Sequence, residues 1–100
     1  MRSGYDLSED AREDLRNIWE FIAEDSLDAA DRVIAELFEA FEGLVKMPGK
    51  GHQRQDLTDK PVLFWPVRSY LIIYRPDKDP LEVIGVMHGA RDIPSIIRKR

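Results

Sequence analysis

The side chains with the clearest chemical potential stand close together in the last third of the chain. His88 and Arg91 are three residues apart, in a short polar tail that follows an apolar run rich in β-forming residues. A histidine titrates near neutral pH and can act as a general acid or base. An arginine can bind a phosphate or a carboxylate through two parallel hydrogen bonds. The sequence leaves a structural alternative open for each: a histidine bonded to a loop carbonyl, and an arginine paired with Asp92 or with acidic helices.

Two further positions near this tail could contact a ligand. Arg68 lies with Ser69 at an expected bend between two strands, and Tyr70 begins the strand that follows. Tyr70 could stack on a ligand or could be half-buried in the core. His52 has no cysteine and no second histidine near it, so no metal site is expected. Because no phosphate-binding or nucleophile-elbow motif is present either, the residues alone identify no catalytic group and no cofactor.

The composition is that of one ordinary globular domain. The chain has 100 residues, of which 43% are apolar and 34% are charged, and it has no cysteine. We therefore expect a single domain over residues 1–100, without disulfides or thiolate metal ligands. No apolar run approaches the roughly 20 residues of a membrane-spanning helix, and no signal-peptide core follows segment 1–4. A cytoplasmic protein with no membrane partner is expected.

Charge is distributed unevenly along the chain. Residues 1–46 carry 5 Lys and Arg against 13 Asp and Glu, a net charge of −8, whereas residues 47–100 carry 10 against 6, a net charge of +4. The acidic half indicates solvated helix faces, with a basic partner as the alternative. A chain that is acidic overall is a poor nonspecific binder of nucleic acid, since such binding rests on neutralised phosphates. We also expect no direct sequence-specific DNA binding.

Two amphipathic helices are predicted in the first half. Residues 5–7 alternate in polarity and predict a short strand, after which Ser8 fits the N-cap of a first helix. Ser26 fits the N-cap of a second helix, which ends at Lys46 before Met47-Pro48-Gly49. The short link between the helices predicts an antiparallel hairpin. Apolar residues recur at helical spacing in both helices: Ala11, Leu15, Ile18, Trp19 and Ile22, then Ala30, Val33, Ile34, Leu37, Phe38, Phe41, Leu44 and Val45.

Three strands are predicted in the second half. A polar loop at 48–61 leads to strands at about 62–67, 69–75 and 81–88, all rich in β-branched and aromatic residues. In the middle strand Leu71, Ile72 and Ile73 do not alternate with polar residues, so both of its faces are expected to be covered.

Two prolines complete the outline of the second half. Pro66 has no amide donor, which predicts an edge, a bulge or a strand end, and Pro94 fits the first turn of a short terminal helix. The element order is then β-α-α-β-β-β, with helices and strands segregated. That order predicts an α+β fold in which the antiparallel helical hairpin packs on one face of a twisted antiparallel sheet.

Four segments, taken together in order and spacing, resemble one protein family. Over roughly residues 5–93 the chain resembles the ParE-type toxins of the RelE/ParE superfamily, which belong to type II toxin–antitoxin systems. The segments are Leu7-Ser8 with Ala11, Asp14-Leu15 and Ile18-Trp19; Ala29-Ala30-Asp31-Arg32 with Phe41 and Met47-Pro48-Gly49; Trp65-Pro66-Val67 with Tyr70-Leu71-Ile72-Ile73-Tyr74-Arg75; and Val86-Met87-His88-Gly89-Ala90-Arg91-Asp92.

The resemblance implies a toxin that is held inactive by a ParD-like antitoxin. In the family the antitoxin's C-terminal part covers the toxin, and its N-terminal part is usually a DNA-binding dimer, here expected to be of the ribbon-helix-helix type. Such toxins typically inhibit DNA gyrase and are not enzymes in that role, and growth arrest and plasmid stabilisation are the associated effects. The RelE branch shares the fold but cleaves mRNA in the ribosome. For that alternative His88 is the candidate base, with Arg68 and Arg91 as phosphate contacts.

The chain departs from the family pattern at two places. The family's hairpin bend usually reads Gly-Arg, where this chain has Arg68-Ser69, and an arginine common in the preceding strand is absent from Val62-Leu63-Phe64. Glycine at the bend would permit a positive φ. These changes leave a third interpretation open, in which the chain is a non-toxic binding module with the same fold.

The resemblance also gives candidate residues for two surfaces. The antitoxin is expected to bind by strand addition and by placing a helix in an apolar groove. That groove is predicted from Ile18, Ile22, Val33 and Leu37, flanked by acidic residues. The candidates for target binding are Arg68, Tyr70, His88, Arg91, Arg98 and Arg100.

Overall fold

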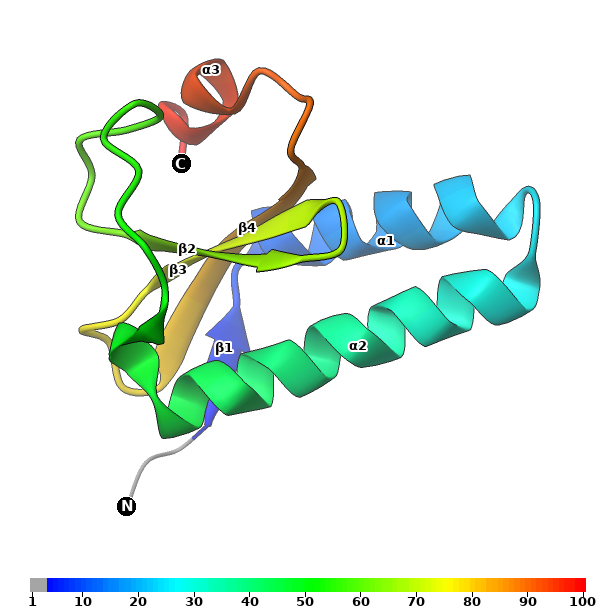
Figure 1. Cartoon of the computed structure of the whole chain (residues 1–100), viewed down its shortest axis with the longest axis horizontal. Helices are drawn as coiled ribbons and strands as arrows, with labels where there is room; N and C mark the ends of the chain where they lie inside the picture. Colours follow the sequence, from blue (N-terminus) through cyan, green and yellow to red (C-terminus); the bar gives the residue numbers. More distant parts are fainter. Residues whose placement is uncertain (1–3) are drawn as a thin grey trace.

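Residues 4–100 form two long helices, a four-stranded sheet and a short terminal helix (Figure 1). The structure is a computed structural model that describes residues 4–100; most of the N-terminal segment 1–4 lies outside the described residues. The elements are β1 (Tyr5–Leu7), α1 (Glu9–Ala23), α2 (Leu27–Lys46), the 3₁₀ turn η1 (Pro48–Lys50), β2 (Leu63–Val67), β3 (Tyr70–Arg75), β4 (Leu81–His88) and α3 (Ile93–Ile97).

Both helices of the hairpin begin at the serines that the sequence indicated. The Ser8 hydroxyl accepts a hydrogen bond from the Ala11 amide at 3.0 Å, and the Ser26 hydroxyl accepts one from the Ala29 amide at 3.1 Å. Each serine thereby satisfies one of the backbone donors that a helix start leaves free. The α+β order is confirmed, and the strand bounds differ from the predicted ones by one residue at 63 and at 70.

The sheet has the strand order β1-β4-β3-β2 and is mixed. The β2–β3 and β3–β4 pairs are antiparallel, as expected, but β1 lies parallel to β4, with Tyr5 opposite Leu81. The expectation of a wholly antiparallel sheet is therefore wrong for β1. Tight turns set the direction of consecutive strands, whereas β1 meets β4 from the opposite end of the chain, where no turn signal exists.

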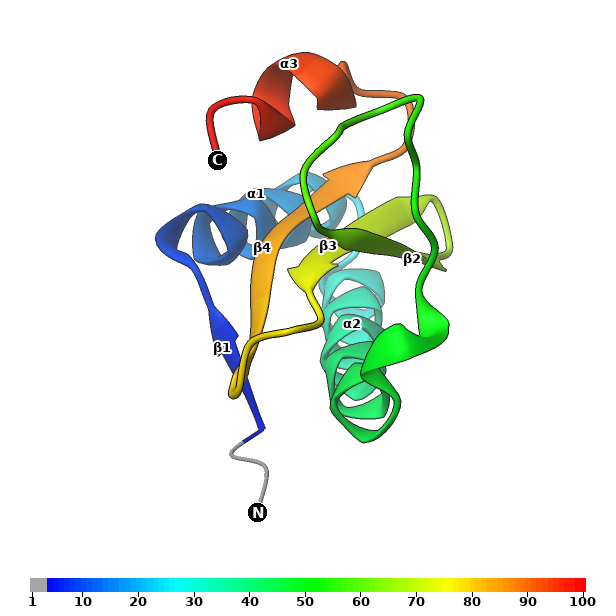
Figure 2. The same cartoon turned by 90° about the vertical axis from the view of Figure 1, so that its left-hand side faces the viewer.

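Side chains cover both faces of the sheet. On one face the hairpin of α1 and α2 packs against Ile72, Val83 and Val86. On the other face α3 and the long loop after η1 pack against Ile73 and Met87 (Figure 2). The middle strand β3 is thus buried from both sides, which confirms the prediction from its unbroken apolar run. Pro66 lies in β2, the edge strand of this sheet, as its missing amide donor required.

The helical hairpin extends past the end of the sheet, to the right in Figure 1. We call this part, residues 19–31, the helical arm. At its base the Trp19 indole donates a hydrogen bond to the Asp31 carboxylate at 2.8 Å, which joins the two helices. Two large apolar side chains of the arm, Phe21 and Leu27, are 72% and 60% exposed. Within residues 4–100, no helix is long and apolar enough to cross a membrane.

Candidate functional site

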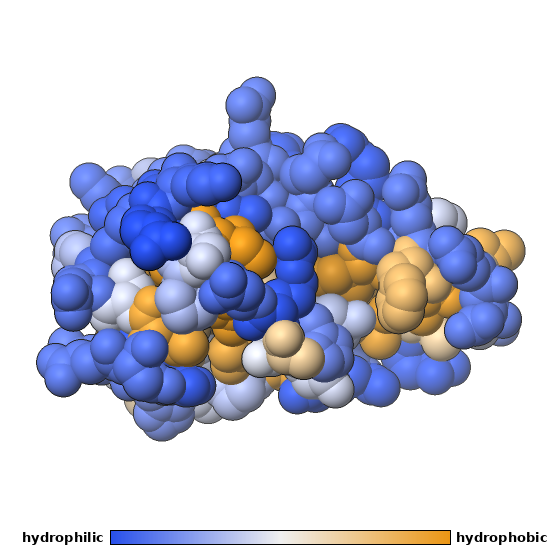
Figure 3. Space-filling view, turned by 90° about the horizontal axis from the view of Figure 1, so that it is seen from above, coloured by the Kyte–Doolittle hydropathy of each residue, from blue (hydrophilic) through white to orange (hydrophobic). Residues whose placement is uncertain are grey.

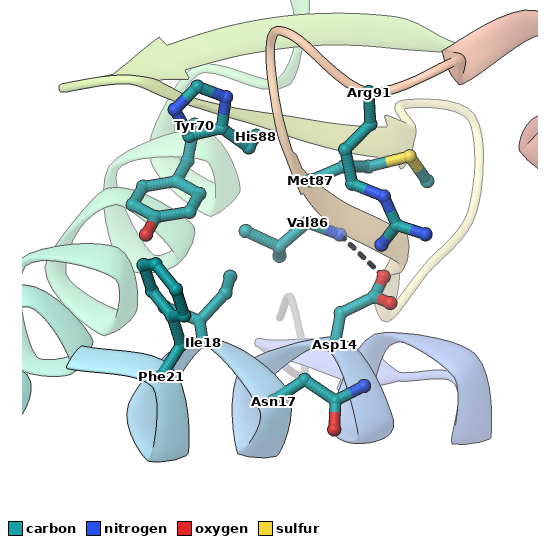
Figure 4. A pocket seen from close by; sticks show the side chains of 9 residues that line it. All are labelled: Asp14, Asn17, Ile18, Phe21, Tyr70, Val86, Met87, His88 and Arg91. Carbon is teal, nitrogen blue, oxygen red and sulfur yellow. Dashed lines mark hydrogen bonds between the residues drawn. The ribbon is translucent and has the colours of Figure 1, made fainter. Parts of the chain in front are cut away.

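A pocket of about 390 Å³ lies between α1 and the C-terminal end of β4 (Figure 4). Its walls are mainly apolar, with polar side chains around the rim. Asp14 and Arg91 stand at one end of it, and Phe21 and Tyr70 at the other. The lining residues are Asp14, Asn17, Ile18, Phe21, Tyr70, Val86, Met87, His88 and Arg91. The pocket therefore brings together three residues that the sequence nominated for target binding: Tyr70, His88 and Arg91.

His88 is exposed at the end of β4, directly opposite Tyr70 on β3. The two rings meet edge to face, with centroids 5.6 Å apart and planes at 83°. The His88 Nδ1 accepts a hydrogen bond from the Ala90 amide at 3.0 Å, so in the neutral imidazole the ring proton is on Nε2. The strand-end alternative is thus partly correct, but the loop partner is an amide donor and not a carbonyl. Nε2 remains available to a ligand.

Arg91 is exposed on the rim of the pocket. Among the residues that the structure describes, it forms no ion pair with Asp92 or with the acidic helices, so the structural alternative for Arg91 is not seen. Its guanidinium and the His88 imidazole are consequently free to bind an anionic or polar group.

Arg100 is bound within the fold instead. Its Nη1 donates to Asp14 Oδ2 at 2.6 Å, its Nη2 donates to Asp14 Oδ1 at 3.1 Å, and Nη1 also reaches the Ile84 carbonyl at 3.1 Å. Asp14 Oδ2 also accepts the Val86 amide at 3.0 Å. The two side chains are only 13% and 6% exposed. The hydrogen bond and the charge of Asp14 raise the pKa of Arg100 above its ordinary value. We call this pair the Asp14–Arg100 clamp.

A β-bulge and a glycine make room for the clamp. Ile73 pairs with Gly85 and Tyr74 pairs with Val83, so Ile84 is an extra residue in β4. Such a bulge bends a strand and redirects its backbone groups, and here the Ile84 carbonyl and the Val86 amide face the clamp. A Cβ atom at position 85 would lie 2.6 Å from Arg100 Nη1. Only glycine leaves space for the guanidinium.

Arg68 is also occupied. It donates two hydrogen bonds to the Glu36 carboxylate, at 2.6 and 2.7 Å, and so ties the β2–β3 bend to α2. These bonds lower the pKa of Glu36 below its ordinary value. The backbone of Arg68 has φ +54°, a region that non-glycine residues rarely adopt. The departure from the family's Gly-Arg bend therefore places an arginine at the strained position and turns its side chain toward α2.

Arg98 stands apart from the other candidates. It is exposed, and its nearest polar partner is the Ser95 hydroxyl at 3.4 Å. Arg98 lines a separate hollow between α3 and the loop at residues 57–60. The structure thus divides the six predicted target-binding residues: three gather at the pocket, two are held in ion pairs, and Arg98 is elsewhere.

The residues predicted for the antitoxin groove are mostly core residues. Val33 and Leu37 are 6% and 0% exposed and pack between the hairpin and the sheet. Ile22 is half-buried against the same core, and only Ile18 lines the pocket. Val33 and Leu37 therefore do not line an open groove as predicted, because the periodic apolar face of each helix is the face that the sheet covers. The apolar hollow lies instead between α1 and β4.

Two positions at the sheet edges already have backbone partners. On the β2 edge, Phe64 exchanges both backbone hydrogen bonds with His52, each at 2.8 Å, and Pro66 has no amide to offer. On β4, the Asp14–Arg100 clamp takes the Val86 amide and the Ile84 carbonyl. An added strand would have to displace these contacts on either side.

Sequence reasoning missed five lining residues of this site: Asp14, Asn17, Phe21, Val86 and Met87. Asp14 did carry a signal, since it falls at helical spacing among Ala11, Leu15 and Ile18, on the buried face of α1. A carboxylate on a buried face needs a charged or hydrogen-bonding partner, and Arg100 supplies one. Within residues 4–100, no group of three metal-ligating side chains gathers in space.

Comparison with known proteins agrees with the fold and identifies the family. The model of the family described as the ParE toxin of the type II toxin–antitoxin system parDE matches residues 5–93. The chain therefore belongs to the ParE toxin family. A similar protein is the candidate toxin Y4kP of Sinorhizobium fredii, with 29% identity over 83 residues, which cover 83% of this chain and 84% of that protein.

A solved structure has the same fold. It belongs to the chromosomal ParDE toxin–antitoxin system of P. aeruginosa and superposes with a TM-score of 0.69 at 13% identity. The match covers 85% of this chain and 94% of the other. At that identity the likeness shows the fold, and the family assignment rests on the match over residues 5–93.

Proposed function

We propose that this toxin acts by inhibiting DNA gyrase and is neutralised by a ParD-like antitoxin of the ribbon-helix-helix type. The observation that carries the proposal is the family match over residues 5–93, joined to the way the structure uses its arginines. An inhibitor that traps an enzyme on DNA needs a binding surface and no catalytic set of its own. The exposed Tyr70, His88 and Arg91 provide a compact surface of that kind.

Ribosome-dependent mRNA cleavage is the second candidate function. The adjacency of His88 and Arg91 on one pocket favours it, because RNA cleavage needs a base for the 2′-hydroxyl and cations for the developing phosphorane charge. Arg68, the third residue expected for that chemistry, is held by Glu36 at 2.6 Å. One histidine and one free arginine make a weak nuclease site, so gyrase inhibition is the better-supported function.

The same pocket offers the antitoxin its binding surface. We propose that the antitoxin fills the hollow between α1 and β4, where Ile18, Phe21 and Val86 give it apolar contacts. An antitoxin seated there covers Tyr70 and His88 and so blocks the surface that gyrase would contact. Of the residues predicted for the antitoxin groove, only Ile18 lines this hollow, whereas Val33 and Leu37 are buried in the core.

Purified gyrase tests the proposed function. The folded protein is added to a supercoiling reaction, and both supercoiled product and cleaved DNA are scored. Lost supercoiling with accumulated cleaved DNA is expected. Gyrase that remains fully active, while the same protein cleaves mRNA in a translating extract, would replace the proposal with the nuclease function; in that case His88→Ala should abolish the cleavage. No effect in either assay would leave a non-toxic binding module.

A further inference from the structure

The pocket between α1 and β4 is electrically polarised along its length. Arg91 lies at one end, beside the N-terminal half of α1, and Phe21 lies at the other (Figure 4). Beyond Phe21, the tip of the helical arm carries exposed acidic side chains for which the structure describes no ion pair within residues 4–100. They are Glu24, Asp25 and Asp28. A ligand lying along the pocket thus has a positive group at its Arg91 end and a negative surface at its Phe21 end.

Arg91 is the free cation at the positive end. Asp14, the carboxylate that lines the pocket beside it, is already bound twice by Arg100 and once by the Val86 amide. The clamp therefore neutralises Asp14 and leaves the Arg91 guanidinium uncompensated. An unpaired guanidinium at the mouth of an apolar pocket favours a carboxylate on the incoming ligand, since the low-dielectric wall strengthens their attraction.

The middle of the pocket is built to take apolar side chains. On α1, Asp14, Asn17, Ile18 and Phe21 face it at helical spacing, a span of eight residues or about 10 Å. That length accommodates roughly two turns of an amphipathic segment. Phe21 is 72% exposed, and apolar surface is visible over the arm in the right half of Figure 3, bordered by hydrophilic side chains.

A polypeptide fits these features better than a nucleic acid does. Phosphates would be attracted by Arg91 but repelled by Glu24 and Asp25 at the arm tip, and the apolar centre offers them nothing. An added β-strand is also disfavoured, because the Asp14–Arg100 clamp occupies the Val86 amide at the adjoining edge. The pocket therefore suits an amphipathic protein segment that brings its own charges.

We propose that the antitoxin segment in this pocket has a fixed charge order: an acidic side chain at Arg91, apolar side chains over Ile18 and Phe21, and basic side chains against the arm tip. The inference rests on the proposed antitoxin site and adds its direction and its specificity. Opposite charges at the two ends of the pocket admit the segment in one orientation and disfavour the reversed one by like-charge contacts. Arg91 and the arm tip thus act as specificity determinants between related antitoxins.

The test measures binding of the ParD-like protein encoded beside this toxin's gene, with calorimetry on the purified full-length chains. Arg91→Glu should weaken binding by about 100-fold, and Glu24→Lys combined with Asp25→Lys by about tenfold. Phe21→Ala should weaken it by about tenfold or more. In the partner, reversing the acidic residue that faces Arg91 should restore binding to Arg91→Glu and weaken binding to the wild type.

Matched variants control for charge and for exposed apolar area. Arg16→Glu makes the same charge change at an exposed arginine of α1 outside the pocket, and Met47→Ala removes an exposed apolar side chain at the C-terminal end of α2, away from the arm tip; both should bind like the wild type. If Arg91→Glu binds the antitoxin as tightly as the wild type does, the proposed charge order is overturned and the proposed antitoxin site is not. A partner that does not bind the wild type at all would overturn the proposed antitoxin pairing and this inference with it.

Discussion

Arg91 and Arg100 lie in the same short C-terminal stretch, yet the fold uses them in opposite ways. Arg100 is 13% exposed and holds Asp14 with two hydrogen bonds, whereas Arg91 is exposed on the rim of the pocket. The difference lies in what a neighbouring element presents. Asp14 offers a buried carboxylate to Arg100, and no described carboxylate reaches Arg91. Whether an arginine is structural or free for binding is decided by the partner, which is remote in sequence.

The clamp also helps to shape the open site. By taking the Val86 amide and the Ile84 carbonyl, Asp14 and Arg100 satisfy the part of β4 that lies beyond the end of β1. Without them, buried polar groups beside the pocket would be left unpaired, at a cost of about 1–3 kcal/mol each. The Asp14–Arg100 clamp therefore holds in place the β4 wall of the pocket.

The largest expected effect comes from removing the carboxylate of the clamp. Asp14→Ala leaves the Arg100 guanidinium buried without its anion and the Val86 amide without its acceptor. We expect a loss of about 3–5 kcal/mol in the free energy of unfolding, measured by denaturant titration. Asp10→Ala is the matched control, because Asp10 is 60% exposed and lies 3.6 Å from Arg100. Equal and small losses for both variants would contradict the structural role of the clamp.

Gly85→Ala should weaken the clamp more gently. The new Cβ would lie 2.6 Å from Arg100 Nη1 and 3.1 Å from the Met87 methyl group, so the guanidinium must shift away from Asp14. The expected cost is about 1–2 kcal/mol in unfolding free energy. In the Asp14→Ala background most of this cost should disappear, since the contact that Gly85 protects is already lost. Additive losses would show that position 85 acts independently of the clamp.

The Arg68–Glu36 pair is intermediate between Arg100, which is bonded and only 13% exposed, and Arg91, which is exposed and has no described ion pair, because it is bonded but exposed. The pKa of Glu36 is lowered in the folded state, so its contribution to stability is present above the ordinary pKa of a glutamate carboxyl, roughly 4.3, and is lost as the pH falls through the lowered value. The effect should be small because both side chains are solvated. As the pH is lowered from 6 into the acid range, the free energy of unfolding should decline less steeply for Glu36→Gln than for the wild type. Identical pH profiles would contradict the pairing.

Arg91→Ala should have the smallest effect on stability. No described group depends on its guanidinium, so the free energy of unfolding should change by less than about 0.5 kcal/mol. The measurement is thermal unfolding of Arg91→Ala and Arg100→Ala side by side; a clear loss of stability is expected for Arg100→Ala. A destabilisation by Arg91→Ala as large as that by Arg100→Ala would erase the distinction between the two arginines.

Local signals predicted much of the fold. The serine N-caps at Ser8 and Ser26, the apolar periodicity of α1 and α2, and the β-rich runs after residue 61 correspond to observed elements. The edge position of Pro66 and the two-sided burial of β3 were predicted for the same reason, because each depends on residues adjacent in sequence. The parallel pairing of β1 with β4 depends on contacts between chain ends, and it was predicted wrongly.

The site was only partly predictable. Tyr70, His88 and Arg91 could be nominated because they lie at the ends of β-rich runs: Tyr70 follows the Arg68-Ser69 bend, and His88 and Arg91 lie at the end of the last run. Val33 and Leu37 were assigned to a groove because apolar periodicity does not distinguish a face buried by the sheet from a face left open to a partner. Arg100 was assigned to a surface because its partner Asp14 is 86 residues away in the chain, and only the folded arrangement brings the two together.

One measurement tests most directly whether the exposed residues of the pocket, Tyr70, His88 and Arg91, and not the Asp14–Arg100 clamp, carry gyrase inhibition. Supercoiling by purified gyrase is titrated with the wild type and with Arg91→Ala, which should remain equally stable. We expect inhibition with accumulated cleaved DNA by the wild type, and at least about tenfold weaker inhibition by Arg91→Ala. Gyrase that is indifferent to the wild type, or is inhibited equally by both proteins, would contradict it.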